Sequence, residues 1–159
     1  MRTAIAAIVL IGAPLVAGAA GAFATTRAPE FFAQLAKPSW APPASVFGPV
    51  WTALYILMGV AAFLVWRTHG SAGARGALIL FGAQLIVNAL WSWLFFRWRL
   101  GIASTADIAL LWLLLVALVI WFVRLRPLAG VLLLPYLAWV TFATALNVAI
   151  VRANPDLLR

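Results

Sequence analysis

Residues 76–96 read GALILFGAQLIVNALWSWLFF, and none of these side chains carries a charge. A helix needs about 20 predominantly apolar residues to cross the hydrocarbon core of a bilayer, and this stretch has that length. Its polar residues Gln84, Asn88 and Ser92 recur every four positions, so a helix places them on one face. The stretch therefore predicts a membrane-spanning helix with one polar face.

Four further segments are also free of charge and of comparable length: Ala4–Ala24, Phe47–Trp66, Ile108–Val123 and Val131–Val151. Asp107 precedes the shortest of them, and we expect it to mark the entrance of that helix near the membrane interface. An open sheet cannot span lipid because its edge groups would lack partners, and the alternating pattern of a barrel strand is absent. The prediction is one all-α domain over residues 1–159, an integral membrane bundle of five transmembrane helices.

The composition indicates the same class. Of the 159 residues, 67% are hydrophobic and 9% are charged, whereas soluble domains have about 45–50% and about 25%. This excludes an ordinary soluble domain, and the high hydrophobicity excludes a disordered chain. The net charge of +8 comes from basic residues dispersed between the apolar segments. That distribution is typical of contacts with lipid headgroups and predicts no nucleic-acid partner. Five spans divide these residues five to six between the two sides, which leaves the orientation open.

The first segment has an alternative interpretation. Arg2, the apolar run and the small residues Ala20–Ala22 resemble a secretory signal with a cleavage site. Signal cores have about 7–15 apolar residues, however, and this run is longer. Ala13, Ala17 and Gly21 recur every four positions, which is the small-residue face that lets membrane helices approach closely. These features favour a retained helix over a cleaved signal.

The connection Thr25–Val46 is long and rich in proline. Pro29, Pro38, Pro42 and Pro43 lie in it and Pro49 follows, while Phe31, Phe32 and Trp40 offer apolar anchors. Connections of this length are usually functional or disordered. Two interpretations have equal weight: a stiff lid folded over the bundle, or a loop that lies in the membrane interface as part of an aromatic belt.

Three segments present faces that combine aromatic rings with a few amides. Trp91 lies beside Asn88, and the other two faces comprise Trp51 with Tyr55, and Tyr136 with Trp139, Ala143 and Asn147. Converging, these faces would line an apolar pocket with a few hydrogen-bonding groups, the usual form of a small-molecule site. Spacing alone also allows ordinary packing, because amides commonly join membrane helices.

Side chains for conventional catalysis are scarce. His69 stands alone in a short loop, the three acidic residues form no pair at helical spacing, and no metal-ligand cluster or phosphate-binding glycine loop occurs. The chain also has no cysteine. No predicted span carries a charge in its middle, which argues against a proton-coupled transporter. The expectation is therefore a binding protein without a metal or a required cofactor, with enzymatic activity uncertain.

Several motifs resemble the TspO/MBR family, the bacterial relatives of the mitochondrial translocator protein. The first is KPSWAPP at residues 37–43, followed by Phe47 and by WTALY at residues 51–55. The resemblance continues with Gln84, NALW at 88–91 and Phe95–Phe96, and then with PYLAW at 135–139 and ATALN at 143–147. It spans nearly the whole chain.

The resemblance implies a five-helix bundle in a bacterial membrane, commonly a homodimer, with a pocket beneath the first loop. It implies porphyrin or haem as the ligand, with the roles of sensor, carrier or scavenger, and as alternatives light-dependent porphyrin degradation or tetrapyrrole transport. Trp51 and Trp139 would be catalytic only in the photo-oxidative case. The ligand-binding residues that it suggests are Trp40, Phe47, Trp51, Tyr55, Asn88, Trp91, Trp139, Ala143 and Asn147.

Two finer expectations follow. Asn88 and Asn147 would donate hydrogen bonds inside the pocket, while Lys37 or the arginines would pair with porphyrin propionates near the surface. The cholesterol motif of mitochondrial members needs a tyrosine, but the corresponding positions here hold Val148 and Ala149 before Arg152. We therefore expect no tight cholesterol binding.

Overall fold

The computed structural model describes residues 2–26 and 28–158, and the regular elements in these ranges are all helical. In chain order they are α1 (Arg2–Ala24), α2 (Ala28–Gln34), the 3-10 turn η1 (Ala44–Val46), α3 (Phe47–Gly73), α4 (Arg75–Ser92), the π-helical turn η2 (Trp93–Arg97), α5 (Gly101–Leu125) and α6 (Pro127–Ala153). Five helices, α1, α3, α4 with η2, α5 and α6, are long and apolar enough to cross a membrane. The predicted all-α bundle with five transmembrane helices is confirmed.

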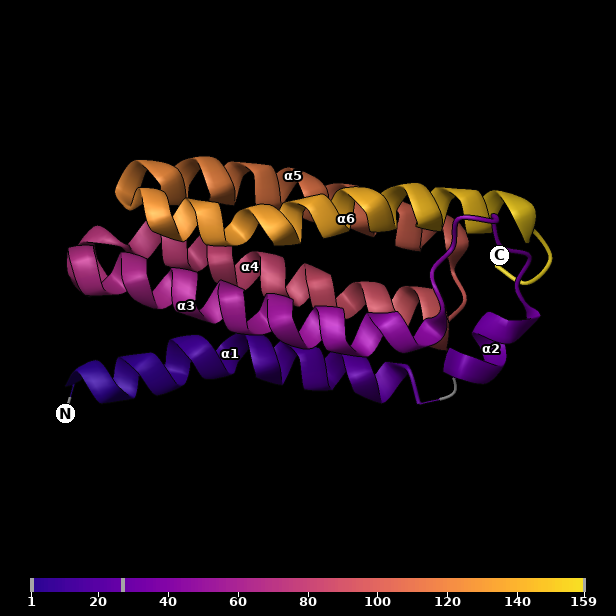
Figure 1. Ribbon diagram of the computed structural model, residues 1–159, viewed down its shortest axis with the longest axis horizontal. Helices are drawn as coiled ribbons and strands as arrows, with labels where there is room; N and C mark the ends of the chain where they lie inside the picture. The colour runs from indigo at the N-terminus through magenta and orange to yellow at the C-terminus, as the bar shows by residue number, and fades with distance from the viewer. Residues whose placement is uncertain (1, 27, 159) are drawn as a thin grey trace.

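The five long helices run side by side along the length of the molecule (Figure 1). In this view α5 and α6 lie along one edge and α1 along the other, with α3 and α4 between them. α1 contacts α3 and α4, whereas α6 contacts α3 and α5. α1 begins at one end of the bundle, and α6 ends at the other, where α2 also lies.

Small residues bring α1 close to its neighbours. A Cβ atom at Gly59 of α3 would lie 2.6 Å from the Cα atom of Ile11, so the two helix backbones touch at this level. About two turns further along α1, Gly18 faces the ring of Tyr55, which lies about one turn before Gly59 in α3. In the small-residue face predicted for α1, Ala13 and Ala17 pack against the hydrophobic core, and Gly21 faces Ser92 of α4. Close approach of this kind is how membrane helices gain packing energy without a hydrophobic driving force.

The helices extend beyond the charge-free segments, and this corrects the expectation for Asp107. α5 begins at Gly101, so Asp107 lies inside the helix and is buried, rather than marking its entrance. The first turn is reinforced by Ser104 and Thr105, whose hydroxyl groups each donate to the carbonyl of Gly101 at 2.9 Å. A charge-free run measures the apolar part of a helix, whereas the helix itself continues as long as its backbone can satisfy its own hydrogen bonds. α6 is longer than expected for the same reason. α3 also continues past Trp66, but its backbone leaves the helical conformation at Gly70, where φ is 67°.

The segment between α1 and α3 is more ordered than a loop. It contains α2, whose Phe31 is buried, and Leu35 follows directly after the helix and is buried too. Both join a small hydrophobic cluster at this end of the bundle, completed by Phe95, Leu146, Ile150 and Leu158. The segment therefore folds back onto the helices, as the lid interpretation requires, and residues 28–46 are called the lid below.

Candidate ligand-binding pocket

A cavity of about 510 Å³ opens among α1, α3, α4 and α6 at the end that α2 covers. Pockets for drug-sized molecules have volumes of about 300–1,000 Å³. The predicted site residues that line it are Phe47, Trp51, Tyr55, Asn88, Trp91, Trp139, Ala143 and Asn147. Trp40 is not among the lining residues: its half-exposed ring packs edge-on against Phe142 at 5.7 Å.

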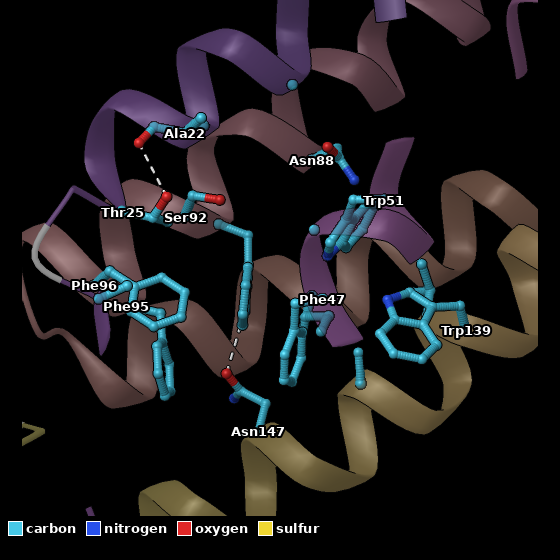
Figure 2. Close-up of a pocket in the computed structure, with 18 of the residues that line it drawn as sticks. Ala22, Thr25, Phe47, Trp51, Asn88, Ser92, Phe95, Phe96, Trp139 and Asn147 are labelled. Carbon is cyan, nitrogen blue, oxygen red and sulfur yellow. Dashed lines mark hydrogen bonds between the residues drawn. The ribbon is translucent and has the colours of Figure 1, made fainter. Parts of the chain in front are cut away.

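The rings in the cavity are held by one another. Trp51 stacks on Tyr55, with ring centroids 5.5 Å apart, and meets Tyr136 edge-on at 6.0 Å. Trp139 and Phe47 meet edge-on at 5.8 Å. Figure 2 shows the side chains of Trp51, Phe47 and Trp139 grouped on one side of the pocket. Such contacts are worth about 0.5–1.5 kcal/mol each beyond area burial, so the aromatic surface is largely preformed.

A buried hydrogen-bond chain fixes Asn88. The hydroxyl of Tyr55 donates to Asn88 Oδ1 at 2.8 Å, and Asn88 Nδ2 donates to the Tyr136 hydroxyl at 2.9 Å. That hydroxyl in turn donates to Gln84 Oε1 at 3.0 Å. The chain joins α3, α4 and α6 and explains why α4 carries two amides within its apolar run. Since Nδ2 has a second hydrogen, Asn88 keeps the capacity to donate a hydrogen bond into the pocket.

Asn147 was expected to donate a hydrogen bond into the pocket, but both polar atoms of its side chain bond within the protein. Its Oδ1 accepts a hydrogen bond from the indole N–H of Trp91 at 3.2 Å, and its Nδ2 donates to Thr105 Oγ1 at 2.8 Å. The side chain thus ties α6 to both α4 and α5, and the dashed line that ends at Asn147 in Figure 2 marks the first of these bonds. We conclude that Asn147 positions the Trp91 ring in the wall of the pocket.

Trp139 differs from Trp91 in one respect. Its indole Nε1 is buried and has no hydrogen-bond partner among the described residues. A buried N–H group without an acceptor costs free energy comparable to a lost hydrogen bond. Trp139 lines the cavity, but this atom is enclosed by the protein, so a bound molecule would reach it only after the Trp139 ring moved.

Among the described residues, no charged side chain lines the cavity. Lys37 or the arginines were expected to pair with porphyrin propionates near the surface. The Lys37 ammonium group instead donates to the carbonyl oxygens of Phe32 at 2.6 Å and Leu35 at 3.0 Å. It thereby caps the carbonyl groups that the end of α2 leaves free. Arg99 has its guanidinium over the ring of Phe31, 4.6 Å from the centroid. Within the described ranges, no group of three or more histidine or acidic side chains could hold a metal ion.

One wall of the pocket was not predicted from the spacing of aromatic and polar residues. α1 contributes Leu15, Gly18, Ala19, Gly21 and Ala22 to the lining. Only Gly21 belongs to the small-residue face that was predicted for helix packing, and the other four lie on a different face of α1. None of the five is polar or aromatic, so the sequence carried no sign that they line a pocket.

Comparison with known proteins supports the family resemblance of the sequence motifs. The model of the TspO/MBR family matches residues 10–152. A tryptophan-rich protein TspO from Chlorobaculum tepidum is 41% identical over 147 residues, covering 91% of this chain and 93% of the relative. A tryptophan-rich sensory protein from Cereibacter sphaeroides is 41% identical over 86% of this chain and 87% of its own length. The human translocator protein is 39% identical over 79% of this chain and 75% of its own length.

Proposed function

Because this chain belongs to the TspO/MBR family, as a multi-pass protein of a bacterial membrane, we propose that its pocket binds a tetrapyrrole such as protoporphyrin IX. The protein would act as a sensor, carrier or scavenger of this ligand. The observation that carries the proposal is the cavity itself: about 510 Å³, walled by aromatic rings and small residues, with a few fixed polar groups.

The chemistry of the lining defines how such a ligand would lie. The macrocycle is flat and largely apolar, so the rings of Trp51, Trp91 and Trp139 are suitable surfaces for stacking and edge contacts. An ionised carboxylate buried without a partner is very costly, and no described cation lines the cavity. The propionates would therefore remain at the mouth, outside the aromatic part of the pocket. Asn88 Nδ2 would donate a hydrogen bond to an acceptor of the buried part.

The binding test is a titration of the purified protein with protoporphyrin IX, followed by the porphyrin's own fluorescence. Exchange of both Trp51 and Trp139 for alanine is expected to weaken binding at least tenfold, since each ring contact is worth about 0.5–1.5 kcal/mol beyond its buried area. Trp121→Ala is the matched control, because Trp121 packs against Gly76 outside the pocket. Equal affinity of the double variant and the control would refute the assigned pocket.

Light-dependent degradation of porphyrin is the second candidate. The observation that favours it is the contact of Trp51 with two tyrosine rings, Tyr55 and Tyr136, beside the cavity. An indole next to a light-excited porphyrin is a ready electron donor, and no acid–base side chain is needed for that step. Illumination in air would consume bound porphyrin, and Trp51→Phe or Trp139→Phe would slow the loss. A rate equal to that of protein-free porphyrin would exclude this activity.

A homodimer is also part of the proposal, as the family resemblance implies. The measurement is the molar mass of the protein in detergent by light scattering with the detergent contribution subtracted. A mass near 17.1 kDa would indicate a monomer, and twice that mass a dimer.

A further inference from the structure

The lid is tied to the bundle by one side chain near the end of the chain. The backbone N–H of Ala36, just after α2, donates to Asn154 Oδ1 at 2.8 Å, and Asn154 Nδ2 donates back to the carbonyl of Ala36 at 2.9 Å. The second hydrogen of Nδ2 goes to the carbonyl of Ile150 at 2.8 Å. The two bonds to Ala36 fix both the position and the orientation of this piece of backbone.

Asn154 is itself held firmly. It ends α6, and its backbone carbonyl accepts the N–H groups of Leu157 at 3.2 Å and Leu158 at 3.0 Å. Leu158 is buried in the cluster below α2, and Asn154 is only 6% exposed although Ala153 and Pro155 beside it are exposed. An amide is the group that suits this place, since it presents a donor and an acceptor on one plane, whereas an ionised carboxylate has no hydrogen to donate.

Among the described residues at the other edge of the lid, no side chain makes such a hydrogen bond to the bundle. Around Thr25 the backbone hydrogen bonds are local: the N–H of Thr25 donates to the carbonyl of Ala22, and that of Ala28 donates to the carbonyl of Thr25. Yet this edge forms part of the pocket, since Thr25, Ala28, Pro29 and Phe32 line the cavity. The lid is continuous in sequence with α1 at one end and with α3 at the other. Between these ends, the hydrogen bonds of Ala36 fix it to Asn154 at the end of α6.

We propose that Asn154 is a positioning residue that holds the lid closed and thereby sets how fast a ligand leaves the pocket. The inference rests on the proposed binding function, but the state of the latch can be measured without a ligand. Asn154 does not touch the cavity, so its effect on the ligand acts through the lid.

Hydrogen exchange of the ligand-free protein tests the latch directly. Asn154→Ala removes all three side-chain bonds, and exchange in a peptide covering residues 35–46 is expected to accelerate on the order of tenfold or more. The control is Asp156→Ala, an exposed residue in the same turn, which is expected to leave exchange unchanged. Unchanged exchange in Asn154→Ala would overturn the proposal, whether or not protoporphyrin IX binds to the wild type.

Ligand release gives the second measurement. After loading with protoporphyrin IX and chasing with excess apo-myoglobin, the dissociation rate of Asn154→Ala is expected to rise on the order of tenfold, with a smaller change in the association rate. If Asn154→Ala exchanges faster in the lid but releases protoporphyrin IX no faster than Asp156→Ala, the proposed role of Asn154 in ligand release is overturned. Failure of the wild type to bind protoporphyrin IX would refute the proposed function. The hydrogen-exchange measurement would then still decide whether Asn154 holds the lid closed.

A tether separates latching from general destabilisation. The native protein has no cysteine, so Ala36→Cys combined with Asn154→Cys can form only one disulfide. The oxidised double variant is expected to release protoporphyrin IX at least as slowly as the wild type, and the reduced form about as fast as Asn154→Ala. Equal release from the two redox forms, with the disulfide shown by mass spectrometry, would overturn the proposal.

Discussion

Replacing Gly59 by alanine tests whether α1 is held against α3 by direct backbone contact. The new Cβ would lie 2.6 Å from Ile11 Cα and 3.2 Å from the carbonyl oxygens of Leu10 and Ile11, whereas ordinary contacts begin near 3.4 Å. The obstacle is backbone, which cannot rotate away, so α1 would have to shift by roughly 0.8 Å. Overpacking of this kind costs about 1–3 kcal/mol. Alanine in place of a helical glycine stabilises a helix by about 0.5–1 kcal/mol, which leaves a net loss of roughly 0–2.5 kcal/mol.

The assay is reversible unfolding in mixed micelles by added SDS, followed by tryptophan fluorescence. Gly12→Ala and Gly82→Ala are the controls, because both glycines are helical and have nothing within 4 Å of the new Cβ. They are expected to raise the free energy of unfolding by about 0.4–1 kcal/mol. Gly59→Ala as stable as Gly12→Ala would refute the inferred backbone contact between the two helices.

Three further predictions concern the polar contacts. Tyr136→Phe removes the hydroxyl that joins the two buried amides of α4, and should lower the free energy of unfolding by about 1–3 kcal/mol in the SDS assay; a loss below about 0.5 kcal/mol would contradict the chain. Asn147→Leu frees the Trp91 indole and should increase the mobility of that ring, seen as lower steady-state fluorescence anisotropy in a variant whose other tryptophans are replaced by phenylalanine; unaltered anisotropy would argue against the tie. Lys37→Met uncaps α2 and should speed hydrogen exchange of residues 28–36 without changing exchange in α5, and equal exchange in wild type and variant would show that the cap contributes nothing.

The transmembrane helices could be predicted because their signal is a property of each segment alone. A charge-free run of sufficient length has few alternatives in a bilayer, and the spacing of Gln84 and Asn88 places both on one face whatever surrounds them. The convergence of the three aromatic faces could be predicted for the same reason. Their rings recur at helical spacing, so three faces directed inward must meet, and Trp51, Trp91 and Trp139 do line one cavity.

The remaining features depend on partners that are distant in sequence. Asn147 could be assigned to the pocket by spacing, but its bond to Thr105 was hidden because Thr105 precedes the charge-free part of α5. The direction of Lys37 depends on where α2 ends, and a proline-rich segment gave no sign of that short helix. Asn154 is separated from Ala36 by 118 positions, and a polar residue after a helix is ordinarily just a cap.

The wall that α1 contributes is a single helix of mostly small residues, and α1 is the least buried of the five spanning helices. A hydrophobic ligand bound as proposed would therefore lie about one helix diameter from the acyl chains, in which it dissolves far better than in water. Its reservoir would be the bilayer, and its occupancy of the pocket would follow its mole fraction there. Two preparations with equal total ligand but different lipid-to-protein ratios would then show different apparent dissociation constants. Dissociation constants measured in different membranes could then be compared only after each is corrected for the partition coefficient of the ligand.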